Sequence, residues 1–313
     1  MEQRNLGRSG LQVSIVGLGC NNFGRRCDKE QTAVVVQKAL ELGITLFDTA
    51  DIYGPGGLSE EYLGAALQGK RREVIIATKF VGPMGEGPLW GGASRRYIVD
   101  AVEASLRRLG TDYIDLYQIH FPDTNTPIDE TLRALDDLVR QGKVRYIGCS
   151  NFTGWQVVEA QWITRTQHLS PIVSAQNQYN LLDRRIERAL VPASRAYGLG
   201  ILPYFPLASG FLTGKYRSGQ PPPEGTRLAG AGPMADRVLT ERNFETLTKL
   251  EAFVESRGRS MLDLAIGWLA SQPCVASVIA GATKPEQLEQ NASAAEWRLT
   301  AEELAEVDTM TRR

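Results

Sequence analysis

The chain has 313 residues, with 42% hydrophobic and 23% charged residues, a composition typical of ordinary folded proteins. Its formal net charge of -1 gives no sign of the strongly basic character that nucleic acids or anionic membranes attract. The N-terminal segment has no apolar signal core, and no apolar run approaches the roughly 20 residues that span a bilayer. We therefore expect neither a nucleic-acid partner nor a membrane partner.

Cysteine and histidine limit the redox and metal chemistry. The two histidines, His120 and His168, belong to no Cys/His cluster with metal-ligand spacing, so we expect no protein-held metal. Scattered cysteines without close pairing favour reduced thiols in a cytoplasmic protein. The four are Cys20, Cys27, Cys149 and Cys274.

Apolar runs and helical patterns alternate along the chain. Near-continuous apolar runs are typical of strands buried on both faces, as in parallel sheets. They lie at residues 15–19, 45–49, 74–79, 114–120, 144–149, 173–177, 201–205 and 276–281. Helical patterns before such runs end in glycine, the preferred residue just past a helix C-terminus: Gly43, Gly69, Gly110, Gly142 and Gly198. This alternation predicts a (β/α)8 TIM barrel, with residues 1–313 forming a single domain.

Three segments depart from the alternation. Residues 5–13 predict a short hairpin at the floor of the barrel. Residues 82–93 and 214–236 are rich in Gly and Pro and follow strand ends, so we expect long loops on the catalytic face. The last helical pattern, AEELAEVDTM, is expected to pack outside the barrel.

Four reactive side chains fall at similar places in this pattern. Asp48, Lys79 and His120 each end an apolar run, and Tyr53 follows the first of these runs. The C-terminal strand ends of a barrel open onto one face, where the chemistry takes place. Each residue alone has an ordinary structural interpretation, such as a turn cap, a solvated charge or packing. Their coincidence at neighbouring strand ends favours a catalytic site.

This set of groups suits the protonation of a carbonyl oxygen. A free tyrosine has a pKa of about 10, and an ammonium nearby lowers that value. Lys79 would supply the ammonium, and Asp48 would hold Lys79 charged. His120 would position the carbonyl oxygen while Tyr53 protonates it. The hydride requires a separate donor, because no side chain supplies one.

The chain resembles the aldo-keto reductases over nearly its whole length. The motifs FDTADIYG, ATKF and QIHFPD are similar to the family's Asp/Tyr/Lys/His tetrad. Further similar motifs follow in family order: GCSNF, QNQYN, PYFPLASGFLTGKY and IAGATKPEQLEQN. The resemblance implies a (β/α)8 fold, NADPH as cofactor, and reversible reduction of an aldehyde or ketone.

The resemblance also implies a set of cofactor-binding residues. Ser150, Asn151 and Gln176 match residues that hydrogen-bond the nicotinamide carboxamide, and Tyr204 matches the aromatic residue that stacks on the nicotinamide ring. The segment around the pyrophosphate contains Pro206, Leu207, Ser209, Gly210 and Lys215, with Arg227 reaching across from the long loop. The adenosine end is matched by Gly281, Thr283, Gln287, Gln290 and Asn291.

Two positions depart from the best-studied members of the family. Gly281 and Gln287 stand where those members carry a lysine and an arginine, so NADH is not excluded as cofactor. No GxGxxG fingerprint occurs in a βαβ context, which argues against a Rossmann enzyme. The substrate pocket is expected to contain Asn22, Phe23, Trp90 and Phe121.

Other functions remain open at the sequence level. The resemblance extends to potassium-channel β subunits, which keep the barrel and the cofactor site, although no long segment precedes the barrel here. A phosphate-sugar isomerase or lyase rests on fold analogy alone. The sequence leaves the oligomeric state and the identity of the carbonyl substrate open.

Overall fold

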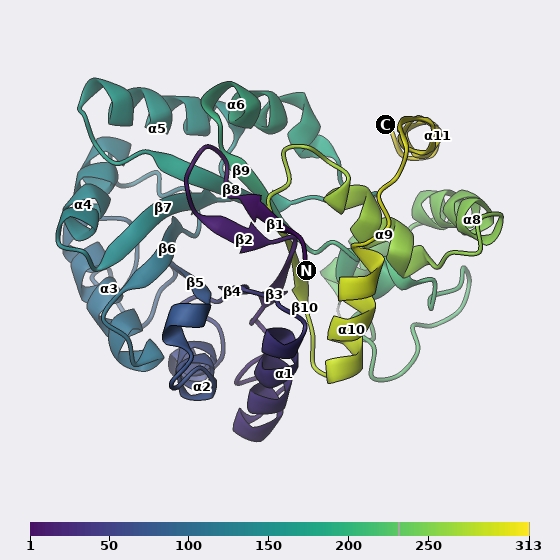
Figure 1. Cartoon of the computed structure of the whole chain (residues 1–313), viewed down its shortest axis with the longest axis horizontal. Coiled ribbons are helices and arrows are strands. Elements are labelled where there is room, and N and C mark those ends of the chain that lie inside the picture. Colours follow the sequence, from purple (N-terminus) through teal and green to yellow (C-terminus); the bar gives the residue numbers. More distant parts are fainter. Residues whose placement is uncertain (231, 313) are drawn as a thin grey trace.

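Eight parallel strands form a nearly closed barrel in the computed structural model, which describes residues 1–230 and 232–312 (Figure 1). The order around the barrel is β10-β3-β4-β5-β6-β7-β8-β9, and a parallel bridge between Ile201 and Val275 connects the two edges. The strands are β3 (Val16–Gly19), β4 (Leu46–Asp48), β5 (Ile75–Phe80), β6 (Ile114–Ile119), β7 (Val144–Ser150), β8 (Ile172–Gln178), β9 (Gly200–Tyr204) and β10 (Val278–Gly281). The predicted fold class is confirmed.

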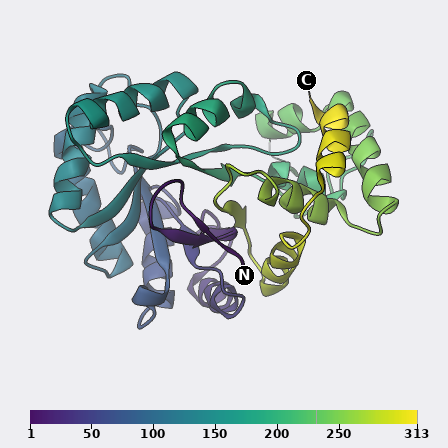
Figure 2. The same ribbon diagram turned by 45° about the horizontal axis from the view of Figure 1, so that its top comes forward.

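Helices surround the barrel, and the last of them gather on one side (Figures 1 and 2). They are α1 (Lys29–Glu41), α2 (Leu58–Ala66), α3 (Arg95–Leu109), α4 (Ile128–Arg140), α5 (Gly154–Thr166), α6 (Leu190–Tyr197), α7 (Pro233–Val238), α8 (Glu241–Glu255), α9 (Met261–Ala270), α10 (Pro285–Ala294) and α11 (Ala301–Thr311). The five glycines expected at helix ends all have positive φ, between 62° and 78°. Glycine adopts this conformation without strain, so the chain can turn from each helix toward the next strand.

The N-terminal hairpin plugs one end of the barrel. It consists of β1 (Gln3–Asn5) and β2 (Gln12–Ser14), which pair antiparallel. Leu6 and Val13 are fully buried and join a cluster with strand residues such as Leu116. In Figure 1 the hairpin lies across the barrel strands, at the ends where they begin. The expected floor hairpin is therefore present.

The two expected long loops begin at the opposite ends of the strands. Residues 82–93 follow β5 and contain no helix or strand. The segment 214–236 follows β9 and the 3-10 helix Ala208–Thr213, and it ends within α7; Ala231 lies outside the described residues. Both loops are thus placed near the C-terminal ends of strands.

The α2–α3 contact leaves no space for a side chain at Gly64. A Cβ there would overlap the backbone carbonyl of Leu109, which cannot move as a flexible side chain can. We predict that Gly64→Ala lowers the free energy of unfolding by about 1–3 kcal/mol, because overpacking displaces backbone. Urea unfolding would measure this. Gly10→Ala is the matched control, since Gly10 has nothing within 4 Å, and equal stability losses in both variants would contradict the packing argument.

Candidate active site

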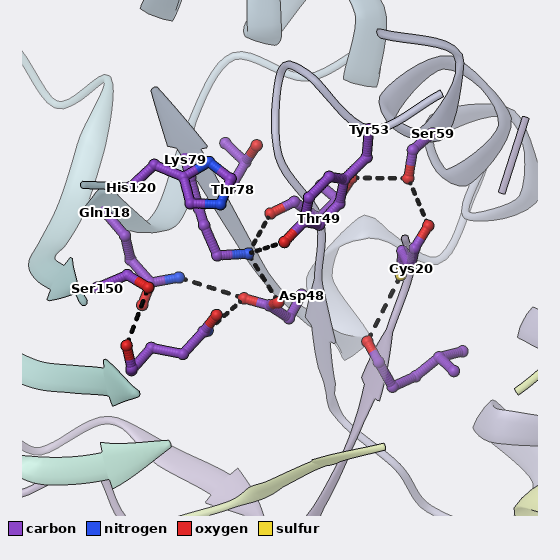
Figure 3. A network of polar contacts seen from close by, with 12 residues as sticks. Cys20, Asp48, Thr49, Tyr53, Ser59, Thr78, Lys79, Gln118, His120 and Ser150 are labelled. Carbon is purple, nitrogen blue, oxygen red and sulfur yellow. Dashed lines mark hydrogen bonds and ion pairs between the residues drawn. The ribbon is translucent and has the colours of Figure 1, made fainter. Parts of the chain in front are cut away.

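Asp48 is the centre of a buried hydrogen-bond network at the C-terminal end of the barrel (Figure 3). Its Oδ2 pairs with Lys79 Nζ at 2.8 Å. Its Oδ1 accepts hydrogen bonds from Gln118 Nε2 at 3.2 Å and from Gln176 Nε2 at 2.7 Å. Asp48 on β4 and its three partners on β5, β6 and β8 are brought to one level by the parallel register of the strands. Sequence reasoning missed Gln118, which lies beside Lys79 across the β5–β6 pair.

Lys79 uses all three of its donor positions inside this network. Besides Asp48, Nζ donates to the backbone carbonyl of Thr49 at 2.8 Å and to the hydroxyl oxygen of Tyr53 at 3.4 Å. Burial acts to lower the pKa of Lys79, but the charge of Asp48 and the nearby Tyr53 more than offset it, so the pKa lies above its usual value. Lys79 therefore stays charged at neutral pH.

The pKa of Tyr53 differs from the sequence-based expectation. Burial, the largest cause, raises the pKa of Tyr53, and the nearby Asp48 charge raises it further. Lys79 lowers it as expected, but not enough to bring the pKa below its usual value. The expectation neglected the loss of water around the phenol, which disfavours phenolate. Lys79 is the donor in its hydrogen bond to the phenol oxygen, so the hydroxyl proton of Tyr53 takes no part in that bond.

His120 is buried and neutral. Burial, together with the charge of Lys79, lowers the pKa of His120 to about 3. Its ring stacks on Phe121 at 4.2 Å between centroids and meets the edge of Tyr53 at 5.7 Å. Its Nδ1 is buried without a hydrogen-bond partner among the described residues. A neutral imidazole can donate one hydrogen bond, but it is not an acid at physiological pH.

A large cavity opens above this network. Its volume is about 1100 Å³, at the upper end of what ligand pockets usually offer. Asp48, Tyr53 and His120 line it, while Lys79 lies behind them and is fully buried. Every residue matched to cofactor binding also lines the cavity: Ser150, Asn151, Gln176, Tyr204, Pro206, Leu207, Ser209, Gly210, Lys215, Arg227, Gly281, Thr283, Gln287, Gln290 and Asn291.

The polar groups nearest the tetrad hold one another in place. The hydroxyl of Tyr204 donates to Asn151 Oδ1 at 2.7 Å, which fixes the plane of the aromatic ring. Asn151 Nδ2 donates to the His120 carbonyl at 3.0 Å, and Ser150 Oγ donates to the Gln176 carbonyl at 2.9 Å. A flat ring and amide groups are therefore preorganised beside the tetrad, as a nicotinamide ring and its carboxamide require.

Two cations suit a phosphate group farther along the cavity, beside a tight turn of the backbone. Phe205, Ala208 and Ser209 have positive φ, which is uncommon outside glycine. Gly210, the next residue, also has positive φ, so the chain turns tightly where it lines the cavity. Lys215 and Arg227 line the same part of the cavity. Arg227 lies over the ring of Phe205, with 5.0 Å between the guanidinium carbon and the ring centroid.

Arg26 is a further cation at the cavity that sequence reasoning did not select. It lines the cavity from the loop between β3 and α1. Burial first, and then the charge of Arg26, lower the pKa of Arg227, so the two guanidinium groups lie near each other. Two cations facing one cavity favour an anion between them. No motif distinguishes Arg26 from other loop arginines, so the sequence offered no signal for it.

Two residues expected in the substrate pocket do not line the cavity. Phe23 is fully buried in the core, because the tight turn that bridges it to Cys27 directs its ring inward. Trp90 is 55% exposed and packs against Gly85 within its own loop. Asn22 and Phe121 do line the cavity.

Metal binding and membrane insertion find no support in the described residues. No group of three or more His, Cys, Asp or Glu side chains there could hold a metal ion. In the same residues, no helix is both long enough and apolar enough to cross a membrane.

Comparisons with known proteins agree with the geometry. Residues 15–312 match the model of the aldo/keto reductase family. The chain is 36% identical to L-glyceraldehyde 3-phosphate reductase of Escherichia coli, over 98% of this chain and 92% of that protein. It is 40% identical to the uncharacterized oxidoreductase YrpG of Bacillus subtilis, over 96% and 93% of the two chains. A probable voltage-gated potassium channel subunit beta of Oryza sativa is 38% identical, over 94% and 91%.

Asp51 lies two residues before Tyr53 and was not selected from the sequence. It is fully buried, and its carboxylate oxygens have no hydrogen bond of normal geometry among the described residues. Burial first, and then the charge of Glu60, raise the pKa of Asp51 to about 8. The folded protein therefore holds a proton on Asp51 that the unfolded chain, with a pKa of about 3.9, releases.

This difference predicts a pH-dependent stability. Below about pH 4, Asp51 is protonated in both the folded and the unfolded state. From about pH 4 to about pH 8 it is protonated only in the folded state, so its contribution to the free energy of unfolding falls as pH rises. Asp51→Asn keeps a neutral group there. We predict that its unfolding free energy, relative to wild type, increases by about 1–3 kcal/mol across this window. Urea unfolding at several pH values would measure it. The exposed Asp112→Asn should show a flat difference, and a flat difference for Asp51→Asn would contradict the assignment.

Proposed function

This chain belongs to the aldo/keto reductase family, whose members are NAD(P)H-dependent oxidoreductases that act on small carbonyl compounds, and we propose that it uses NADPH to reduce an aldehyde or ketone to an alcohol, reversibly. The observation that carries the proposal is that three residues of the tetrad and the residues matched to cofactor binding share one cavity. Asp48, Tyr53 and His120 line one end of a cavity whose remaining walls contain all the residues matched to cofactor binding.

The tetrad would protonate the carbonyl oxygen. A bound reduced nicotinamide supplies the hydride in this chemistry. Tyr53 keeps its proton, since its pKa is raised mainly by burial, and it donates that proton to the oxygen as negative charge develops there. Lys79 stabilises the phenolate that remains, because its ammonium lies 3.4 Å from the phenol oxygen. His120, neutral at physiological pH, donates a hydrogen bond that orients the substrate.

The rest of the cavity would hold the dinucleotide. Ser150 and Asn151 would bind the carboxamide, with the amide of Gln176 shared between the carboxamide and Asp48. Tyr204 would stack on the nicotinamide ring, and Lys215 and Arg227 would bind the pyrophosphate. The adenosine would lie against the start of α10, where Gln287 Oε1 accepts the Thr283 N–H at 2.7 Å. Asn22 and Phe121 would contact the substrate.

All four cysteines are free, which is consistent with a reducing cytoplasmic location.

A second candidate function is that of a cofactor-binding channel subunit, because two relatives carry the name of a probable voltage-gated potassium channel subunit beta. Carbonyl turnover separates the two candidates, since a purely regulatory subunit requires none.

Tyr53→Phe tests the proton donor. We predict that turnover of benzaldehyde with NADPH falls by about 10²- to 10⁴-fold, the usual contribution of a general acid, while NADPH affinity is retained. The fold should survive because Lys79 keeps its bonds to Asp48 and Thr49. Steady-state kinetics and calorimetric titration would measure the two effects. Tyr62→Phe on α2 is the matched control, and unchanged turnover in Tyr53→Phe would refute the assigned role.

Arg227→Ala tests the placement of the pyrophosphate. We predict that NADPH and NADH both bind about 10- to 100-fold more weakly, because the pyrophosphate is common to both and a charge-assisted hydrogen bond is lost. Calorimetric titration of each cofactor would measure this. The exposed Arg242→Ala on α8 should bind both like wild type. A loss confined to NADPH would assign Arg227 to the adenosine phosphate instead, and no loss would remove it from the site.

A further inference from the structure

A second cavity lies at the opposite end of the barrel, under the loop of the N-terminal hairpin. Its volume is about 740 Å³, and it shares no lining residue with the catalytic cavity. The hairpin loop closes one side, where the Arg8 N–H donates to the Gly198 carbonyl at 2.8 Å. The starts of β7 and β8 and the ends of α5 and α6 form the other sides. In Figure 1 this loop lies on the face turned to the viewer, beside β8 and β9.

Four basic side chains line this cavity from separate parts of the chain. Arg8 comes from the hairpin loop, Arg145 from β7, Arg165 from α5 and His168 from the turn before β8. None of the described residues that line it is an aspartate or a glutamate. The whole chain has a net charge of -1, so overall composition does not explain why basic side chains gather here without acidic ones. The cavity therefore has a local positive potential.

Two of the three arginines stack on aromatic rings rather than pairing with carboxylates. The guanidinium carbon of Arg145 lies 4.8 Å from the ring centroid of Tyr113, and that of Arg165 lies 4.6 Å from that of Tyr197. Within residues 1–230 and 232–312, no ion pair involves Arg8, Arg145 or Arg165. Stacking fixes a guanidinium plane and leaves its N–H edges available to an anion.

The surrounding groups do not neutralise these charges. Asp136 contacts Ser170 of the cavity wall, and its Oδ1 accepts the N–H and the hydroxyl of Ser170, both at 2.8 Å. Its Oδ2 pairs with Arg140 at 2.6 Å, so its charge is already compensated. His168 has a positive φ of 55°, a conformation that costs energy outside glycine and that often marks a functional position.

From these observations we propose that the floor cavity is a second binding site, separate from the active site, for a small organic phosphate. Arginine forks match phosphate oxygens, and three arginines complement a group that carries several negative charges. The volume exceeds what an inorganic ion alone would fill, and Tyr146 and Tyr197 offer apolar surface to an organic part. The proposal does not depend on the reaction catalysed at the other end of the barrel.

Inorganic pyrophosphate is the probe for the charged part of such a ligand. Calorimetric titration would use the full chain carrying Lys215→Ala and Arg227→Ala, which removes the cations of the catalytic cavity. We expect one remaining site at constant ionic strength. Adding Arg145→Glu and Arg165→Glu should weaken it at least about tenfold, because repulsion replaces charge-assisted hydrogen bonds. The matched control adds Arg242→Glu and Lys249→Glu on α8, which change the net charge equally and should leave the site intact.

The results distinguish a specific binding site from general electrostatic attraction. No binding in the catalytic-cavity variant, equal weakening in the floor and α8 variants, or unchanged binding in the floor variant would each overturn the proposal. If charge reversal prevents folding, Arg165→Gln provides the same test, because this exposed side chain makes no bond to the backbone in the described residues. Added to the Lys215→Ala and Arg227→Ala variant, it should reduce the rise in unfolding temperature that pyrophosphate induces, and an equal rise with and without Arg165→Gln would overturn the proposal.

Discussion

The candidate active site depends on one buried ion pair, between Lys79 and Asp48. Removing two charges from water costs more than their attraction returns unless further hydrogen bonds satisfy them. Here every donor of Lys79 is used, and both oxygens of Asp48 accept. Because the partners sit on β4, β5, β6 and β8, the pair is stable only while those strands keep their register. The barrel therefore positions the Lys79–Asp48 pair, and the hydrogen bonds of that pair in turn restrict how far the strands can shift.

Burial also determines the protonation state of the neighbouring groups. It raises the pKa of Tyr53 and of Asp51, and it lowers that of His120. All three residues are consequently neutral near neutral pH, around a lysine that remains charged. The site therefore contains one ion pair, Lys79 with Asp48, and several neutral groups, and the ammonium of the pair lies beside the phenol oxygen of Tyr53, where it would stabilise developing negative charge.

The strands, and the clustering of the tetrad side chains, could be predicted from the sequence because their signals are local. Apolar runs mark the strands, glycine marks the helix ends, and parallel register then brings Asp48, Lys79 and His120 to one end of the barrel. The residues proposed to bind the cofactor were selected only through family resemblance. Loop side chains were not predictable in this way. Phe23 points inward because of a turn, Trp90 packs within its own loop, and the pKa of Tyr53 depends on the burial around it.

The same strands connect two sites of opposite character. From Arg145 to Ser150, β7 spans roughly 17 Å at about 3.3 Å per residue, from the floor cavity to the catalytic cavity. At the catalytic end, charge is buried and compensated; at the floor, three arginines face a cavity without a carboxylate on its walls. The N-terminal face of such barrels usually contributes stability rather than chemistry. The three arginines at that face are exposed and form no ion pair within the described residues, so the proposed anionic ligand would supply the counter-charge.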